Sequence, residues 1–294
     1  MTEDSKLNSW LIASRPRTLL AAFVPVMVGS AVAFNEGKLN IIFSLAALIC
    51  SILIQVATNF TNDLYDFLNG ADTVKRKGPR RVLASGLISV GEMKAAVILT
   101  FLTAFLIGLY LVYHGGFVIL AIGVLSIIAG FAYTAGPYPL AYNALGDVFV
   151  FMFFGIVGTV GTYFLHTKEL SLVSFISSVP VGALVTNILV VNNYRDADED
   201  KITGKKTLAV KYGKNFSRYQ FIFLIAISFL VPLLLFLSFD ASIFIFLPYL
   251  TLPIAYKVIT MIYTLTGAEL NKTLELTAKL SAIYGLLFSA GFVL

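Results

Sequence analysis

The sequence predicts an all-α fold, a polytopic membrane helix bundle of about nine transmembrane helices with a cytoplasmic N-terminus. Its composition is 58% hydrophobic and only 13% charged, whereas a soluble domain carries about 25% charged residues. The apolar residues also form long blocks: residues 18–35 and 39–62 contain no charged side chain, and residues 95–167 contain only Asp147. Because a spanning helix needs roughly 20 mostly apolar residues, these blocks are predicted to be membrane spans.

Glycine and proline divide the blocks into separate helices, since both residues interrupt helical segments. The breaks are HGG at 114–116 and TAGPYP at 134–139. The expected helices cover residues 18–35, 41–66, 94–113, 117–134, 145–166, 171–193, 218–238, 242–262 and 274–293. The last of these carries Glu275 and Lys279 in its first turns. We expect the whole chain, 1–294, to form one integral-membrane domain.

The basic residues test this arrangement, because Lys and Arg collect in cytoplasmic loops. With nine spans and the N-terminus inside, all of the 21 basic residues except Lys38 and Lys168 lie on the cytoplasmic side. The chain is therefore predicted to be a multi-pass protein of the cell's inner (cytoplasmic) membrane. The net charge of +5 follows this topology and does not indicate binding to nucleic acid.

Carboxylates and amides gather where the second span meets the cytoplasm, in ATNFTNDLYDFLNGADT at 57–73. Asn59, Asp63 and Asp66 are spaced i, i+4 and i+7, and Asn62 lies four residues before Asp66. This spacing places their oxygens on one helix face. Taken alone, the cluster is equally consistent with an ordinary solvated helix end.

A second cluster of the same form follows the sixth span, in NNYRDADEDKITGKKT at 192–207. Asn192, Asp196 and Asp200 are spaced i, i+4 and i+8. Ionisable groups at membrane depth are costly and usually functional, and two facing carboxylate sets repel each other unless cations lie between them. Hard oxygen ligands of this kind favour Mg²⁺, which is typically held by a few carboxylates together with substrate phosphate oxygens.

Basic residues surround both clusters, and a minority of them are expected to bind a diphosphate, because Arg and Lys are the usual phosphate ligands. For most of them the alternative explanation is membrane topology alone. A diphosphate held at the mouth of a lipid-embedded bundle suggests a substrate with a long apolar tail, and a polyprenyl diphosphate has this chemistry. The lipid bilayer is the other expected partner.

Several segments resemble the UbiA superfamily of intramembrane prenyltransferases, in particular its branch that prenylates 1,4-dihydroxy-2-naphthoate in menaquinone synthesis. The matching segments are RPRTL at 15–19, NDLYDFLNGADT at 62–73, GPRRVLASG at 78–86, TAGPYPLAYNALGD at 134–147 and NNYRDADEDKITGKKTLAVKYG at 192–213. The broader family spaces its first motif as Asn, Asp four later and Asp eight later. Here the eighth position after Asn62 is Gly70, and the next acid is Asp72.

The resemblance implies an Mg²⁺-dependent prenyltransferase with its active site facing the cytoplasm. Asp66 and Asp196 would be the catalytic residues. The implied metal ligands are Asn62, Asp63, Asp66, Asp72, Asn192, Asp196 and Asp200. The implied substrate-binding residues are Asn59, Lys75, Arg81, Tyr133, Arg195, Lys201 and Lys206.

The implied reaction is attack of the naphthoate ring on the allylic cation left when diphosphate departs, with loss of the ring carboxylate. Another aromatic acceptor, such as 4-hydroxybenzoate or homogentisate, is the alternative within the superfamily. A cation transporter is the alternative outside it, but transporters place their acids near the bilayer midplane. Both clusters here are expected at cytoplasmic helix ends.

Overall fold

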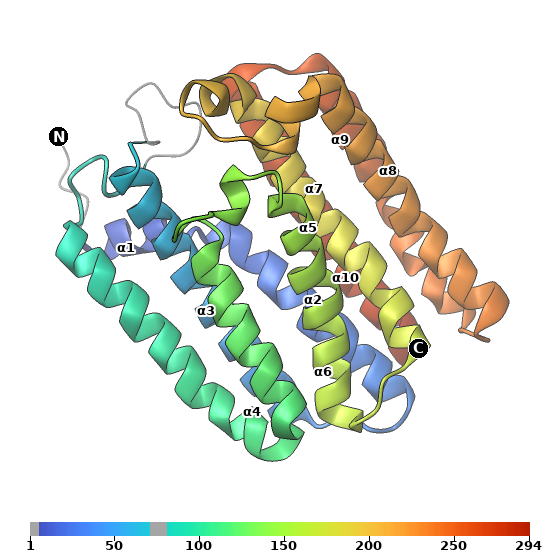
Figure 1. Cartoon of the computed structure of the whole chain (residues 1–294). Coiled ribbons are helices and arrows are strands. Elements are labelled where there is room, and N and C mark those ends of the chain that lie inside the picture. Colours follow the sequence, from blue (N-terminus) through green and yellow to red (C-terminus); the bar gives the residue numbers. More distant parts are fainter. Residues whose placement is uncertain (1–5, 71–80) are drawn as a thin grey trace.

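The computed structural model of the protein describes residues 6–70 and 81–294. Within these residues the chain folds into helices and turns without a β-strand (Figure 1). Eight of the helical segments are long and apolar enough to cross a membrane. Large apolar side chains are exposed along these helices, for example Leu106, Leu230 and Leu286. Since such a surface is stable only in contact with lipid, the chain is a multi-pass membrane protein.

The N-terminal part of the fold consists of α1 (Lys6–Ser14), α2 (Pro16–Asn35) and α3 (Ile41–Leu68). Arg15 separates α1 from α2 with a left-handed backbone, φ 52°, which is uncommon for a residue with a side chain. Trp10 of α1 packs its ring against Phe60 of α3 in an edge-on contact, with centroids 5.4 Å apart. This contact holds α1 against the end of α3 that carries the first motif.

The long helix α4 (Val90–Ala132) contains two spans. Gly116 has φ 69° and ψ −159° inside it, a conformation that only glycine adopts at little cost. The chain therefore reverses at this residue, and the two arms of α4 form a hairpin (Figure 1). With α4 counted as two spans, the described residues hold nine, and the prediction of about nine helices is confirmed.

The next span, α5 (Gly146–Val150), η2 (Phe151–Val157) and α6 (Gly158–Thr167), is preceded by the short 3-10 turn η1 (Leu140–Tyr142). Its middle segment, η2, is π-helical, a widened turn that often occurs at functional sites. Gly155 of η2 packs directly on Gly182 of α7 (Leu172–Ile202), and a Cβ at Gly155 would lie 2.8 Å from the Gly182 Cα atom. Small residues allow membrane helices to approach this closely.

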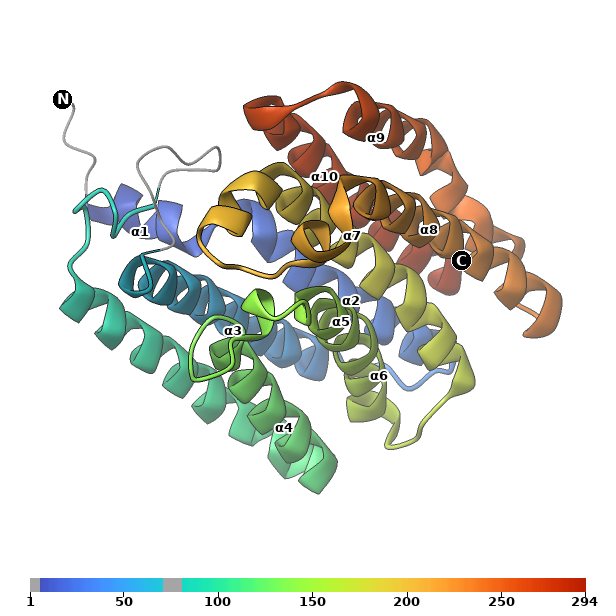
Figure 2. The same ribbon diagram turned by 45° about the horizontal axis from the view of Figure 1, so that its top comes forward.

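The C-terminal half contains α8 (Leu208–Ser238), η3 (Ile243–Thr251), α9 (Leu252–Thr264), η4 (Gly267–Glu269) and α10 (Leu270–Val293). Together with α2 and α7, the helices α8, η3, α9 and α10 share one large apolar core, which includes Phe221, Tyr284 and Phe288. A smaller core joins α1, α3 and the first arm of α4. In Figure 2, α3 and α4 lie on one side of α5 and α6, while α7 to α10 lie on the other.

The second motif lies on a helix that is longer than expected. The sixth span was predicted to end at residue 193, but α7 continues to Ile202, so Asn192, Asp196 and Asp200 all lie on helical backbone. The first motif likewise lies within α3 as far as Leu68. The motif-bearing ends of α3 and α7 line the same cavity, although the motifs are separated by about 130 positions in the chain.

Candidate active site

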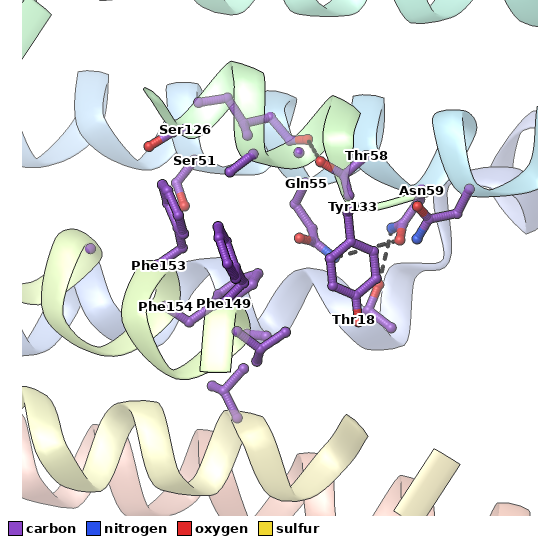
Figure 3. A pocket seen from close by; sticks show the side chains of 18 of the residues that line it. Thr18, Ser51, Gln55, Thr58, Asn59, Ser126, Tyr133, Phe149, Phe153 and Phe154 are labelled. Carbon is purple, nitrogen blue, oxygen red and sulfur yellow. Dashed lines mark hydrogen bonds between the residues drawn. The ribbon is translucent and has the colours of Figure 1, made fainter. Parts of the chain in front are cut away.

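A cavity of about 850 Å³ lies inside the bundle, lined by α2, α3, both arms of α4, the α5–α6 span and α7. Its polar end is formed by Asp63, Asp66, Asp196 and Asp200. Its remaining walls are mostly apolar, and Figure 3 shows Phe149, Phe153 and Phe154 facing Ser51 and Gln55 across it. A polar mouth with an apolar interior suits a ligand with a charged head and a hydrocarbon tail.

Asp66 is the most heavily bonded carboxylate at the polar end. Its Oδ1 atom accepts hydrogen bonds from the Tyr142 hydroxyl at 2.7 Å and from the Lys205 ammonium at 2.9 Å. Its Oδ2 atom accepts one from Arg81 Nη2 at 3.1 Å. Lys205 also lies over the Tyr142 ring, 4.6 Å from the centroid. Side chains from four segments of the chain therefore meet at one buried carboxylate.

Asp63 lies one turn earlier on α3 and shares Arg81 with Asp66. Arg81 Nη1 is 3.3 Å from Asp63 Oδ1. The other carboxylate oxygen of Asp63, Oδ2, is buried and has no hydrogen-bond partner among the described residues. An unbonded, buried carboxylate oxygen is energetically costly, and it indicates that this position is suited to a cation that supplies the missing contact.

The second motif is held by its own arginine. Arg195 binds the Asp196 carboxylate through Nε and Nη2, each at 2.6 Å. Its Nη2 also donates to Asn192 Oδ1 at 2.8 Å, and its Nη1 donates to Asn271 Oδ1 of α10 at 2.6 Å. Arg195 is buried, so this network fixes the orientation of Asn192 and Asp196 toward the cavity. Protein cations thus lie against Asp63, Asp66 and Asp196.

The basic residues predicted to bind substrate differ in whether they line the cavity. Arg81 and Arg195 line the cavity, whereas Lys201 and Lys206 are exposed and lie outside its lining. Lys205, which was not among the predicted substrate-binding residues, lines the cavity in their place. Asp72 and Lys75 lie outside the described residues. The functional roles assigned to all of these residues stay predictions.

Three further predicted residues line the cavity near its mouth. Asn59 donates from Nδ2 to the Ser14 carbonyl at 2.9 Å and to Thr18 Oγ1 at 3.1 Å, so it supports the α1–α2 junction (Figure 3). Asn62 accepts from Thr134 Oγ1 at 2.7 Å. The Tyr133 ring projects into the pocket.

The donor set fits a divalent cation that is bound together with a diphosphate. Within residues 6–70 and 81–294, no three acidic, histidine or cysteine side chains lie close enough to hold an ion. Mg²⁺, however, is usually held by one or two carboxylates together with substrate phosphates. Asp63, Asp66, Asp196 and Asp200 supply hard oxygens on both sides of one cavity, and the unbonded oxygen of Asp63 is available to a cation.

Four residues that support the site were not among the predicted site residues: Tyr142, Lys205, Thr134 and Asn271. The first three belong to segments that had been singled out as motifs, so a signal was present, although it did not identify the individual side chains. Asn271 lies in the last span, where the sequence offered only apolar character.

Comparison with known proteins agrees with this geometry. The model of the UbiA prenyltransferase family matches residues 22–283. The chain belongs to the UbiA prenyltransferase family. The family resemblance predicted from the motifs is thereby confirmed, and the match covers both carboxylate motifs and most of the residues that line the cavity.

Curated relatives within the UbiA family match most of this chain. It is 32% identical to the 1,4-dihydroxy-2-naphthoate octaprenyltransferase of Haemophilus influenzae over 99% of its own length and 97% of that protein. It is 38% identical to the protein of the same name from Escherichia coli over 75% of this chain and 74% of that one. The Bacillus subtilis protein of this name is 31% identical, with 96% and 91% covered.

Solved UbiA structures share the fold. A UbiA homologue from Archaeoglobus fulgidus bound to DMAPP and Mg²⁺ aligns with a TM-score of 0.64 at 17% identity, covering 96% of this chain and 99% of that one. The apo structure of a UbiA homologue from Aeropyrum pernix aligns with a TM-score of 0.69 at 14% identity, covering 93% and 96%. At these identities the likeness establishes the helical architecture.

Proposed function

We propose that this protein transfers a polyprenyl group from polyprenyl diphosphate to 1,4-dihydroxy-2-naphthoate, releasing diphosphate and CO2, as a step of menaquinone synthesis. The observation that carries the proposal is the single cavity described above, with two carboxylate motifs and their cations at one end and apolar walls beyond them. The shared name of the bacterial relatives supports the naphthoate as acceptor. The whole chain would act as one prenyltransferase domain.

The charged residues at the mouth would bind the diphosphate and stabilise it as it leaves. Lys205 and Arg81 line the cavity beside Asp66, and side chains of this kind provide point-charge and bidentate contacts to phosphate oxygens. Mg²⁺ bound with the diphosphate would neutralise the charge that develops on the leaving group. The proposed protein ligands are Asp63, Asp66, Asp196 and Asp200, with Asn62 and Asn192 beside them.

The reaction breaks the bond between the allylic carbon and the diphosphate oxygen, and the electron pair departs with the diphosphate. The naphthoate ring carbon that bears the carboxylate then bonds to the allylic carbon. Loss of CO2 returns its electron pair to the ring and restores aromaticity. The aromatic faces of Tyr133, Phe149 and Phe153 line the cavity, and such faces stabilise a nearby cation while apolar walls exclude water.

Recognition of the carboxylate on the naphthoate acceptor would need a protein cation near the mouth of the cavity. Arg15 and Arg81 both line the cavity. Arg81 is held in place by two carboxylates, so it presents a fixed guanidinium at the site. The active site would open on the cytoplasmic side of the inner membrane, because the loops next to both motifs carry most of the basic residues.

One experiment identifies the acceptor and tests prenyl transfer. The purified protein in lipid vesicles is supplied with Mg²⁺, a polyprenyl diphosphate and an equimolar mixture of 1,4-dihydroxy-2-naphthoate, 4-hydroxybenzoate and homogentisate. Mass spectrometry should show the prenylated, decarboxylated naphthol as the main product. A main product made from 4-hydroxybenzoate or homogentisate would contradict the naphthoate assignment, and absence of every prenylated product would contradict prenyl transfer.

A further inference from the structure

An arginine held between two tyrosine rings lies outside the cavity, where α7, α8 and α9 meet. The Arg218 Cζ atom of α8 is 5.4 Å from the centroid of the Tyr194 ring of α7 and 4.8 Å from that of the Tyr263 ring of α9. We call these three side chains the Arg218 cage. Arg218 is not among the residues that line the cavity, so a ligand bound to the cage would not occupy the proposed substrate site.

The positive charge of Arg218 has no carboxylate to balance it. Among the described residues, its guanidinium forms no ion pair and no hydrogen bond, and its Nε atom is buried. Lys214, one turn earlier on α8, lies 5.9 Å from the centroid of the same Tyr194 ring, but it pairs with Asp198 at 2.9 Å. Aromatic faces attract a cation without neutralising it, and a partly buried charge without a counter-ion is costly. The cage is therefore suited to an anion.

The outer end of the Arg218 guanidinium is open to a ligand. Arg218 as a whole is half-buried. Its two Nη nitrogens also lack a partner among the described residues, but unlike Nε they are not buried. Paired N–H donors of a guanidinium match the geometry of phosphate oxygens. Because the two rings already restrict the side chain, little further conformational freedom is lost when an anion binds.

The cage lies at the level expected for lipid headgroups. The start of α8 and the turn that follows α9 lie at one end of the bundle (Figure 1). Arg218 comes shortly after Gly213, where non-helical backbone interrupts α8, and Tyr263 is in the last turn of α9. Tyr219 and Tyr263 are exposed, and exposed tyrosines near span ends are typical of the membrane–water interface.

An apolar surface continues from the cage along α8. Tyr219, Phe223 and Leu230 are exposed, and their spacing of i, i+4 and i+11 places them on one face of the helix. The neighbouring helix α9 exposes Tyr256. The region thus offers a cation at the end of the bundle and apolar side chains next to it. A soluble phosphate would use only the cation, whereas a phospholipid would use both.

We propose that the Arg218 cage binds the phosphate of an anionic phospholipid whose acyl chains lie along the exposed face of α8. Anionic membrane lipids attract Lys and Arg near span ends, and the arginine adds paired hydrogen bonds to the phosphate oxygens. Tyr194 directly precedes Arg195, which holds Asn192 and Asp196. A lipid on the cage would therefore stabilise the packing of the part of α7 that carries the second motif.

Substitutions at the cage separate a lipid site from a structural brace. If Arg218 only holds the three helices together, its loss lowers stability equally in every lipid. Arg218→Met removes the charge and keeps an unbranched stem, whereas Arg218→Lys keeps the charge and loses the planar fork. Lys94→Met is the matched control, because it removes one exposed positive charge from α4, outside the cage.

The measurement is native mass spectrometry of the full chain, titrated with phosphatidylglycerol or with phosphatidylcholine of the same acyl chains. Arg218→Met should weaken binding of phosphatidylglycerol by about fivefold or more and leave binding of phosphatidylcholine nearly unchanged. Arg218→Lys should lie between Arg218→Met and the wild type, and Lys94→Met should match the wild type. Phosphatidylglycerol should also raise the melting temperature of the wild type but not that of Arg218→Met.

Equal affinity of the wild type and folded Arg218→Met for phosphatidylglycerol would overturn the proposal. So would a melting temperature that Arg218→Met lowers by the same amount in both lipids, which is the result expected of a brace. Stabilisation of the wild type by glycerol phosphate alone, lost in Arg218→Met, would show a phosphate site and overturn the assignment to a lipid. If Arg218→Met does not fold, Tyr263→Leu replaces an exposed ring of the cage and should weaken binding of phosphatidylglycerol about twofold or more.

Discussion

The Tyr142 hydroxyl and the Asp66 carboxylate form a hydrogen bond of 2.7 Å between η1 and the end of α3. A second bond reinforces this connection, because the Lys206 backbone N–H donates to the Tyr142 carbonyl at 2.9 Å. Tyr142 thereby joins the loop before α5 to the turn after α7 and to the first motif. The two carboxylate motifs are thus held in register partly by a residue that belongs to neither.

Tyr142→Phe should reduce kcat/KM roughly fivefold, because one hydrogen bond to Asp66, worth about 1 kcal/mol, is lost. The ring remains, so Lys205 keeps its contact with an aromatic face. Steady-state kinetics with both substrates measure the effect. Tyr138→Phe is the control, since Tyr138 is exposed in the same loop. Equal kinetics for the two variants would show that the Tyr142 hydroxyl has no positioning role.

Lys205→Met should raise the KM for polyprenyl diphosphate roughly tenfold and leave the KM for the naphthoate nearly unchanged, because a charged contact to the diphosphate is removed. Lys211→Met is the control, since Lys211 is exposed on α8 and is absent from the cavity lining. A similar rise in both KM values would indicate that Lys205 supports the site as a whole. An unchanged KM for the diphosphate would contradict the assignment of Lys205.

Asp66→Asn and Asp196→Asn should each abolish turnover while the protein stays folded, since the amide keeps the shape of the side chain but loses its charge. Asp198→Asn provides the comparison, because Asp198 is exposed and pairs with Lys214 outside the cavity. Product formation and thermal unfolding are measured for all three variants. Near-wild-type rates in both cavity variants would mean that the motifs are ordinary helix ends.

Removal of divalent cations with excess chelator should abolish activity, and Mg²⁺ should restore it, because the diphosphate leaves with a charge that the protein's own cations only partly balance. Calorimetric titration of Mg²⁺ in the presence of a non-hydrolysable prenyl diphosphate analogue gives a second readout, and Asp63→Asn should weaken that binding. Full activity in excess chelator would remove the basis for a metal at this site.

Gly182→Ala should lower the melting temperature of the detergent-solubilised protein. The new Cβ would lie 2.9 Å from the Phe151 carbonyl oxygen and 3.1 Å from the Gly155 Cα atom, and overpacking of this kind typically costs about 1–3 kcal/mol. Gly91→Ala, at a position with no heavy atom within 4 Å of the new Cβ, should leave the melting temperature unchanged or raise it slightly. Identical unfolding of the two variants would contradict close packing of η2 against α7.

Helical periodicity was sufficient to predict which polar residues of each motif share one helix face. Asn62 and Asp66, like Asn192 and Asp196, are four residues apart, so a helix at each position places both on one face regardless of tertiary detail. The nine spans followed from hydropathy and from the basic residues for a similar reason, because bilayer thickness and charge asymmetry act on each segment locally. Even the reversal of the chain between the arms of α4 was visible as HGG at 114–116.

Residues placed by turns were not predictable in this way. After α7 ends, the Lys205 backbone N–H returns to the Asp200 carbonyl at 2.8 Å, and this turn sends Lys205 into the cavity while Lys201 and Lys206 face outward. The pairing of Arg195 with Asn271 likewise depends on how α7 packs against α10. Sequence spacing carries no information about either arrangement, because both depend on tertiary packing.

The contact of Trp10 with Phe60 makes Trp10 an intrinsic fluorescent reporter of the packing between α1 and α3. The chain contains one tryptophan, so its fluorescence reports a single place: the seam where α1 rests on α3, one residue from Asn59. Asn59, which lines the cavity, donates a hydrogen bond to the Ser14 carbonyl. This bond connects the contact between α1 and α3 to the cavity mouth. A ligand that rearranges the mouth should shift the indole emission, so binding can be followed in unlabelled protein, without turnover and before any acceptor is added.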